Sequence, residues 1–334
     1  MSVNLKELAR RLGMAPSTVS RALKNHPDIS EKTKKAVREL AAQLNYVPDT
    51  VAWSLRSRKS RQIAMIVPEI ARDFFATVIS AAERAVIRSG YSLVIFQSSE
   101  DSGQEQEVCR IIEHSGVAGV LASVARTTRN TDHFRSIQAK GIPLLFFDRI
   151  AGDIDTDRVV TDDFGGAYLA VEHLIHSGRK RIMHLASNQY LQIAQKRKMG
   201  YTRALQDNGI VPEEEFILLC DDKKFIDREL SAFIRRLSPD AVFAFDDMMA
   251  AACMQILKKG GYKIPGDVAV CGFSNSLLAS YTEPGLTTVE QEGTEIGRVA
   301  VEMLLERIDK SGNRPTVTKV LKNRLIVRGS TGSV

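Results

Sequence analysis

Residues 4–25 read NLKELARRLGMAPSTVSRALKN, and this stretch decides how the start of the chain folds. Leu5, Leu8 and Leu12 recur at helical spacing, and Gly13 is a typical helix stop, so a first helix is expected to end there. The PSTVSRAL segment that follows has an apolar side of its own and predicts a second, short helix. Two helices joined by a turn of about four residues, with glycine first in the turn, are typical of a helix-turn-helix.

The second helix carries more polar side chains than a helix buried in a core would. Ser17, Thr18, Ser20 and Arg21 crowd onto it. In a helix-turn-helix this helix enters the major groove, where hydroxyls reach base edges or phosphates and a guanidinium pairs with O6 and N7 of guanine. Serine and threonine near a helix start also satisfy backbone groups, so a purely structural role for the hydroxyls stays open.

The positive charge of the chain is concentrated at its start. Residues 1–61 contain 13 Lys and Arg against 5 Asp and Glu, a balance of +8, so the remaining residues carry 33 against 35 and a balance of −2. A compact basic segment ahead of a nearly neutral body is typical of a module that binds a polyanion. A solvated basic tail is the alternative, but it would lack the apolar periodicity of this segment.

A third helix is expected from ISEKTKKAVRELAAQLNY, with Ser30 as its N-cap. Its cationic side chains can contact DNA phosphates or can each be a solvated surface charge; they are Lys32, Lys34, Lys35 and Arg38. The VPDTVAWSLRSRKSR segment after it predicts one more helix of about eight residues, too short to be stable alone in water. That helix must be ordered by a partner.

From residue 62 onward, apolar runs such as IAMIVP, YSLVIFQ, PLLFFD and VAVCGF alternate with amphipathic helical stretches. Strands that are apolar on both faces, in strict alternation with helices, predict parallel sheets covered by helices, and about ten such runs fit two sheets better than one. In such sheets ligands lie beyond the carboxyl ends of the strands. The residues that follow those ends are therefore the candidates for a binding site.

Several classes of protein are disfavoured by the sequence. A hydrophobic fraction of 44% with 26% charged residues is typical of a globular protein, and no apolar run reaches the ~20 residues needed to cross a bilayer. The start of the chain lacks the features of a signal peptide, which a solute-binding protein for transport would need, so we expect a cytoplasmic, nucleoid-associated protein. The four cysteines are widely spaced and indicate neither a zinc site nor a disulfide framework. An enzyme is disfavoured because no phosphate loop, GxSxG motif or metal-ligand cluster is present, and no cofactor is expected.

TVSRAL, the ISEKT start of the third helix, LNYVPDTVAWSL and the arrangement of the body resemble the lactose repressor family of bacterial transcription regulators over essentially the whole chain. The resemblance implies an α/β fold with a three-helix helix-turn-helix headpiece over residues 1–48 and a hinge helix and linker over 49–61. Residues 62–334 would form a two-lobed domain like periplasmic sugar-binding proteins, with two parallel sheets and three crossovers. Lobe one would comprise about 62–160 and 292–320, and lobe two about 161–291 and 321–334.

The resemblance also implies which residues contact DNA. Arg21 matches the arginine of the recognition helix, and Pro16 and Ser17 stand at the two positions that choose the operator sequence. Leu55 matches the leucine that wedges into the minor groove and kinks the duplex, and it lies beside the basic run that contains Arg58. The DNA contacts are thus expected at the following residues: Pro16, Ser17, Thr18, Ser20, Arg21, Lys24, Leu55 and Arg58.

Two departures from the family pattern affect the headpiece. Ala15 replaces the serine that usually caps the recognition helix, a loss of about 0.5 to 2 kcal/mol that Pro16 at the first helical position partly offsets. Lys24 stands where many members have asparagine, so the family's contact beyond Arg21 does not carry over directly.

An effector is expected in the cleft between the lobes. Matching the family position by position places the following residues there: Asp73, Phe74, Arg149, Arg197, Asp246, Asn275 and Gln291. Asp163 is expected to cap a helix. Ser274 and Asn275 replace the aspartate that sugar-responding members often carry, and two arginines are expected to point at the cleft. These features favour, as a hypothesis, an effector with a negative group, such as a sugar phosphate or sugar acid.

The sequence therefore predicts a homodimeric DNA-binding transcription regulator, most often a repressor in this family, whose affinity for a pseudo-palindromic operator in double-stranded DNA depends on a small carbohydrate-type effector. Only GSTGSV follows Arg328, in place of the leucine heptad that makes tetramers in some members, so a dimer is the largest assembly expected. A regulator that answers to a partner protein instead of a small molecule is the alternative within the same class.

Overall fold

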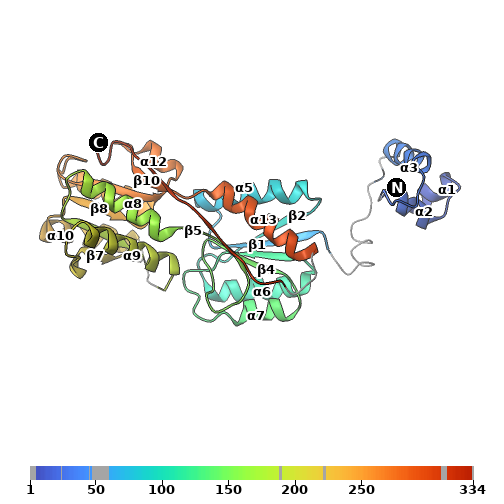
Figure 1. Ribbon diagram of the computed structural model, residues 1–334, viewed down its shortest axis with the longest axis horizontal. Helices are drawn as coiled ribbons and strands as arrows, with labels where there is room; N and C mark the ends of the chain where they lie inside the picture. The colour runs from blue at the N-terminus through green and yellow to red at the C-terminus, as the bar shows by residue number, and fades with distance from the viewer. Residues whose placement is uncertain are drawn as a thin grey trace. The chain divides into compact units, whose positions relative to one another are not determined.

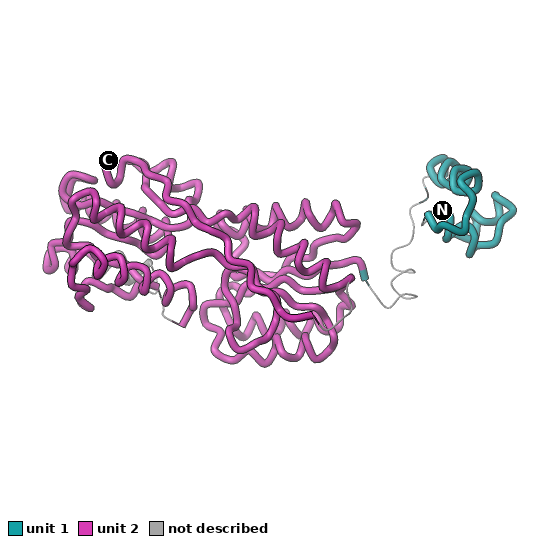
Figure 2. Tube along the Cα trace, viewed as in Figure 1, with its two compact units in different colours: residues 1–60 teal, residues 61–334 magenta. Residues whose placement is uncertain are grey.

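The computed structural model describes residues 5–23, 25–44, 46, 60–187, 190–220, 223–309 and 314–332, with the backbone alone for 223–228. The chain divides into two compact units, residues 1–60 and 61–334, which are coloured separately in Figure 2. Each unit has its own core.

The described part of the first unit is a bundle of three helices, α1 (Leu5–Arg11), α2 (Pro16–Leu23) and α3 (Glu31–Gln43). Gly13 takes a φ of +61° in the turn between α1 and α2, a conformation that glycine adopts without strain. The side chain of Ser30 accepts a hydrogen bond from the Thr33 amide, so the predicted N-cap of α3 is confirmed. The three helices enclose a small apolar core made of Leu8, Ala9, Val19, Ala22, Val37 and Ala41.

The second unit contains two six-stranded sheets, seen in Figure 1 as two lobes. The first sheet has the strand order β11-β5-β4-β3-β1-β2 and is made of β1 (Gln62–Val67), β2 (Ser92–Gln97), β3 (Gly119–Ala122), β4 (Leu144–Phe147), β5 (Asp157–Thr161) and β11 (Thr318–Leu321). Apolar side chains fill both of its faces. Its helices are α5 (Asp73–Arg88), α6 (Ser102–Ser115), α7 (Asp132–Ala139) and α13 (Gly293–Asp309).

The second sheet repeats this plan in the order β12-β10-β9-β8-β6-β7. Its strands are β6 (Ile182–Ala186), β7 (Ile217–Leu219), β8 (Ala241–Ala244), β9 (Ala269–Ser274), β10 (Thr287–Glu290) and β12 (Arg324–Ile326). Cores on both faces join it to α8 (Asp163–His176), α9 (Gln192–Asp207), α10 (Lys223–Leu237), α11 (Asp247–Lys259) and α12 (Leu277–Tyr281). The prediction of two helix-covered sheets is confirmed.

One strand pairing departs from the all-parallel prediction. β11 runs parallel to β5, whereas β12 runs antiparallel to β10. The segment that contains both strands passes straight from one sheet into the other (Figure 1). The parallel strands of both lobes end toward the junction between the lobes, so a straight segment that is parallel in one sheet must be antiparallel in the other.

Each lobe also contains a close helix pair with glycine at the contact. A Cβ atom on Gly200 of α9 would lie 2.3 Å from the Phe164 carbonyl oxygen of α8, and one on Gly297 of α13 would lie 2.3 Å from the Val78 carbonyl oxygen of α5. The absence of a side chain at both positions lets the helices pack backbone against backbone. This packing fixes α8, which carries residues of the candidate site.

Cys109, Cys220, Cys253 and Cys271 are buried, as predicted for core residues. Over the described part of the chain, no helix is both long and apolar enough to cross a bilayer. The same residues contain no group of His, Cys, Asp and Glu side chains arranged to hold a metal ion.

Candidate functional site

The exposed face of α2 is polar and basic. Pro16, Ser17 and Arg21 are exposed, Thr18 and Ser20 are half-buried, and the apolar residues of the same helix lie in the core. Ser17 and Arg21 are four residues apart, which places them on one face of the helix. The predicted contact residues within 16–21 therefore share an accessible surface. Lys24, Leu55 and Arg58 lie outside the described residues.

The helix begins without a side-chain cap. The Ala15 carbonyl oxygen accepts from the Thr18 and Val19 amides at 2.9 and 3.1 Å, so α2 starts with Pro16 at its first position, as predicted. The expectation that Lys34 is available for phosphate contacts is wrong. Lys34 is 5% exposed and its Nζ lies 2.8 Å from Glu31 Oε1, so its charge is engaged within α3 and does not face a partner.

In the second unit, several predicted effector residues meet where the two lobes join. Arg197 is 2% exposed and packs its guanidinium 3.6 Å from the centre of the Phe273 ring. Its Nε and Nη2 lie 2.9 and 2.8 Å from Asp163 Oδ1, and its Nη1 donates to the Phe245 carbonyl oxygen at 2.6 Å. The guanidinium is therefore fixed on several sides.

Asp163 does not cap α8. Asp162 caps this helix, because its Oδ1 accepts from the Gly165 amide at 2.9 Å. Asp163 is buried and pairs with Arg197. Burial raises the pKa of Asp163 above its usual value despite the opposing effect of the Arg197 charge.

Arg149 of lobe one is held in a similar way. Its Nη1 donates to both carboxylate oxygens of Glu100, at 2.9 and 2.7 Å, and both side chains are largely buried. Burial by itself would raise the pKa of Glu100, but the charge and hydrogen bond of Arg149 outweigh it and hold the pKa below its usual value. Glu100 has a φ of +59° in a loop after β2, an uncommon conformation for this residue type.

Asp148 lies between these two ion pairs. It is 5% exposed, and burial, helped by the charge of Asp163, raises its pKa to about 6, while Arg149 and Arg197 act in the opposite direction. Asp148 Oδ2 lies 3.9 Å from Arg149 Nε, and the charges of Asp163 and Arg197 in the other lobe also act on it. Below, the interlobe charge cluster denotes the following residues: Glu100, Asp148, Arg149, Asp163 and Arg197.

Two predicted residues form contacts that cross from one lobe to the other. Asp73 Oδ2 accepts from the Leu277 amide at 2.9 Å. Asp246 Oδ2 lies 3.1 Å from Arg72 Nη1, while its Oδ1 caps α11 by accepting from the Met249 amide. Both carboxylates thus hold the lobes in the observed orientation.

The remaining predicted residues have different surroundings. Gln291 is buried in a crossover, where its Nε2 donates to Thr161 and its Oε1 accepts from Ser274, each at 3.2 Å. Asn275 Nδ2 donates to Glu290 at 2.9 Å, and its Oδ1 accepts from Arg328 at 2.8 Å. Phe74 is half-buried and packs edge-on against Phe75. Gln291 thus belongs to the junction between the lobes, whereas the amide of Asn275 is tied to its own lobe.

Sequence reasoning missed Arg72, Glu100 and Asp148 as members of this site. Asp148 directly precedes Arg149 at the end of β4, so the rule that ligands lie beyond strand ends could have included it. Glu100 is 49 positions from Arg149 in the sequence, and no local sequence pattern predicts that the two side chains pair.

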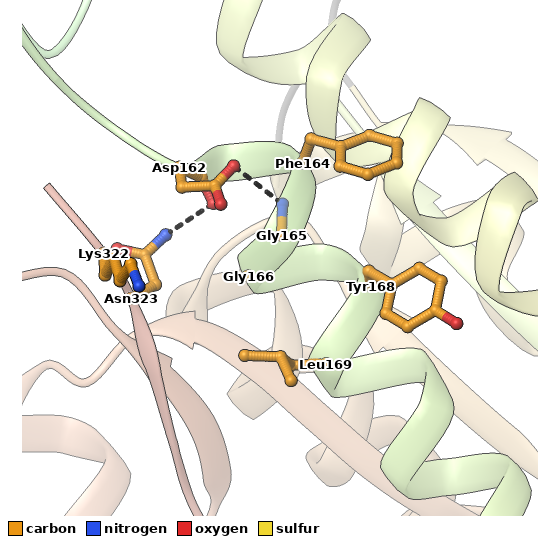
Figure 3. Close-up of a pocket in the computed structure, with 8 residues that line it drawn as sticks. All are labelled: Asp162, Phe164, Gly165, Gly166, Tyr168, Leu169, Lys322 and Asn323. Carbon is orange, nitrogen blue, oxygen red and sulfur yellow. Dashed lines mark hydrogen bonds between the residues drawn. The ribbon is translucent and has the colours of Figure 1, made fainter. Parts of the chain in front are cut away.

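A cavity of about 420 Å³ lies beside the start of α8 and the crossover near residue 322 (Figure 3). In it, Asn323 Nδ2 donates to the Asp162 carbonyl oxygen at 3.0 Å. The predicted effector residues do not line this cavity. Its lining residues are Asp162, Phe164, Gly165, Gly166, Tyr168, Leu169, Lys322 and Asn323.

Two family models match the chain, one in each of its two compact units. Residues 4–49 match the family described as "Bacterial regulatory proteins, lacI family", and residues 171–331 match the one described as "Periplasmic binding protein-like domain". The first match falls on the three-helix bundle and the second on the two-lobed unit.

Curated relatives align along nearly the full length. The chain is 31% identical over 333 residues to the NTD biosynthesis operon regulator NtdR of Bacillus subtilis (strain 168), covering 98% of this chain and 99% of that protein. It is 32% identical over 315 residues to the HTH-type transcriptional repressor PurR of Vibrio cholerae serotype O1 (strain M66-2), with 93% of each covered.

Solved structures share the architecture. The transcriptional regulator CelR in complex with cellobiose superposes with a TM-score of 0.74 at 27% identity, over 98% of this chain and 99% of that one. The lac repressor dimer bound to operator and the anti-inducer ONPF has a TM-score of 0.84 at 22% identity over the full length of both chains, a likeness of fold. Similar regulators thus align over the headpiece and both lobes, and the chain belongs to the lacI family of bacterial regulatory proteins.

Proposed function

We propose that this chain is a homodimeric, sequence-specific DNA-binding repressor whose operator affinity is controlled by a small carbohydrate-type effector between its lobes. The observation that carries the proposal is the exposed face of α2, with Ser17 and Arg21 projecting from a small basic bundle. A regulator of this kind acts in the cytoplasm, at the nucleoid. The proposed division of the chain is headpiece 1–48, hinge 49–61 and effector domain 62–334.

The headpiece reads the operator through α2. Arg21 has the planar fork that recognises guanine, and Pro16, Ser17, Thr18 and Ser20 occupy the same accessible helix. With a balance of +8 over residues 1–61, phosphate contacts supply much of the affinity, so binding should weaken as salt rises. Lys24, Arg58 and the wedge residue Leu55 complete the proposed interface.

The effector acts through the relative orientation of the lobes. The contacts between Arg72 and Asp246 and between Asp73 and the Leu277 amide exist only when the lobes are close. A ligand that binds one orientation better than another shifts their populations, and by linkage it changes DNA affinity by the same coupling free energy. The proposed ligand contacts are Asp73, Phe74, Arg149, Arg197, Asp246, Asn275 and Gln291.

Exposed apolar side chains support a dimer of this chain. Ile95 lies on β2, at the edge of the first sheet, and is 39% exposed. In the second lobe, Met248, Leu277 and Tyr281 are each more than half exposed, on the adjacent helices α11 and α12. Large apolar side chains grouped at a surface are typical of protein interfaces. Two headpieces in a dimer predict a pseudo-palindromic operator.

The structure bears on the hypothesis of a sugar phosphate or sugar acid as effector. That hypothesis rests on the missing aspartate together with two arginines that point at the cleft, and Arg149 and Arg197 are each paired with a carboxylate. This pairing favours an uncharged carbohydrate. The structural neighbour CelR was solved in complex with cellobiose.

A selection from sheared genomic DNA tests the proposal. Fragments retained by the purified chain at low salt are sequenced, and we expect them to share a two-fold symmetric motif. The matched control is Arg21→Ala, which should lose the motif while it keeps salt-sensitive binding to any duplex. Retained fragments that share no motif in the unchanged chain would contradict a sequence-specific regulator.

A further inference from the structure

Each arginine of the interlobe charge cluster is paired with a carboxylate of its own. Arg149 is matched by Glu100 through two contacts of 2.9 and 2.7 Å, and Arg197 is matched by Asp163 through two contacts of 2.9 and 2.8 Å. All four side chains are largely or fully buried, so solvent screens these charges little.

The carboxylates at this junction outnumber the guanidiniums. Arg72 Nη1 is matched by Asp246 at 3.1 Å, and its Nε by Glu69 at 2.9 Å. Asp148 adds a further acid between the pairs, and Asp73 adds one at the contact with Leu277. Glu69 and Asp73 reach solvent, whereas Asp148 is buried beside the two ion pairs, so an incoming anion would meet an extra negative charge there in a region of low dielectric constant.

The hydrogen-bonding character of these groups leads to the same conclusion. Ionised carboxylates only accept hydrogen bonds, and phosphate or carboxylate groups of a ligand are acceptors too. A hydroxyl both donates and accepts, so a polyhydroxy ligand can donate to spare carboxylate oxygens and accept from Gln291 or a guanidinium.

We propose that Glu100 and Asp163, by neutralising Arg149 and Arg197, make the interlobe site select an uncharged polyhydroxy effector and reject anionic ones. This inference rests on the proposed function, because it concerns the same effector site. Glu100 and Asp163 are positioning residues. They fix the direction of each guanidinium and set its net charge, and the ligand meets the remaining donors.

The first test uses inorganic phosphate as a probe of the full chain, measured by isothermal titration. We expect the unchanged chain and the Arg149→Met variant to bind phosphate equally at millimolar concentration. No saturable phosphate binding should therefore depend on Arg149. Phosphate bound in the Arg149→Met variant as well is assigned to the basic headpiece and subtracted. Saturable binding that depends on Arg149 in the unchanged chain would overturn the proposal.

The second test removes one counter-charge. Glu100→Gln keeps the shape of the side chain and frees Arg149, so phosphate affinity should rise by about 10- to 100-fold, the range of a charge-assisted hydrogen bond. Glu107→Gln is the matched control, since it also breaks a glutamate–arginine pair, with Arg110, but at an exposed position of α6. A merely structural role for Glu100 would not raise phosphate affinity, and equal affinities in both variants and the unchanged chain refute the proposal.

The third test needs no variant and holds even if Glu100→Gln does not fold. Matched pairs, D-glucose with its 6-phosphate and D-ribose with its 5-phosphate, are compared by titration and by the shift in melting temperature. In every pair that binds, the uncharged sugar should bind more tightly. A phosphate ester that binds more tightly than its parent sugar contradicts the proposal. None of these measurements uses DNA, so a chain that rejects anions but ignores operators would refute only the proposed function.

Discussion

Replacing Arg197 by methionine should destabilise the second lobe strongly. Methionine keeps an unbranched apolar stem against the Phe273 ring but removes the guanidinium. Asp163, which is 1% exposed, would then be a buried carboxylate without its cation, and the Phe245 carbonyl oxygen would lose its 2.6 Å donor. The variant therefore removes one partner of a buried pair while it leaves the packing largely intact.

The magnitude follows from the burial of both partners. Breaking a buried ion pair on one side costs about 3 to 5 kcal/mol, because a charge remains without compensation. The orphaned carbonyl adds about 1 kcal/mol. Partial protonation of Asp163 offsets some of this, so we expect the free energy of unfolding to fall by about 3 to 5 kcal/mol.

Urea denaturation followed by circular dichroism measures the loss. Arg203→Met is the matched control on the same helix, because Arg203 pairs with Asp207 at 2.9 Å but its side chain is 60% exposed. An exposed pair of this kind contributes less than about 1 kcal/mol. The double variant Arg197→Met/Asp163→Asn should recover part of the loss, since it removes the uncompensated charge as well.

The stability loss caused by Arg197→Met should also depend on pH. Burial raises the pKa of Asp163 in the folded chain, and loss of Arg197 would raise it further. The folded variant then binds a proton more tightly than the unfolded variant, so its deficit should shrink as the pH falls from 7 to 5. An Arg197→Met variant that unfolds at the same urea concentration as the unchanged chain would refute the account of this pair.

Four further outcomes are expected. Gly297→Val should cost about 1 to 3 kcal/mol of unfolding free energy in urea, because its Cβ would lie 2.3 Å from the Val78 carbonyl oxygen, and an unchanged midpoint would contradict that close approach. Ser30→Ala should cost the headpiece about 0.5 to 2 kcal/mol and lower the temperature at which DNA binding is lost, since the cap of α3 is removed. Arg21→Ala should lose about 1 to 3 kcal/mol of discrimination at one guanine, measured by competition between operator variants, with little change for random duplexes. Burial lowers the pKa of His184 to about 4, so the unfolded chain takes up a proton between about pH 6.5 and 4 that the folded chain does not. Acidification should therefore cost up to about 3 kcal/mol of stability, and His184→Gln should flatten this part of the pH profile.

The elements of the fold were predictable because their causes are local. Gly13 and Ser30 mark the ends of helices through their own backbone preferences, and the alternation of apolar strands with amphipathic helices indicates parallel sheets. The antiparallel pairing of β12 was not predictable in this way. It follows from a straight segment that crosses two lobes, which no local pattern encodes.

The site was predictable only in part, for a related reason. Asp162 and Asp163 are adjacent and equally suited to cap a helix, and only the position of Arg197 on a neighbouring helix shows that Asp163 is buried as an ion-pair partner. The pairing of Glu100 with Arg149 likewise depends on two strand ends that meet in space. Charge balance at the site is therefore a property of the tertiary structure.

The central claim is that a basic headpiece binds duplex DNA through α2 under the control of the lobes behind it. Fluorescence anisotropy with a selected operator duplex, titrated at several salt concentrations, tests this most directly. We expect tight binding at low salt, a linear fall of log affinity with log salt, a loss of operator preference in Arg21→Ala, and a change of affinity when the effector is added. A chain that leaves the anisotropy of duplex DNA unchanged at low salt, with or without sugars, would contradict the claim.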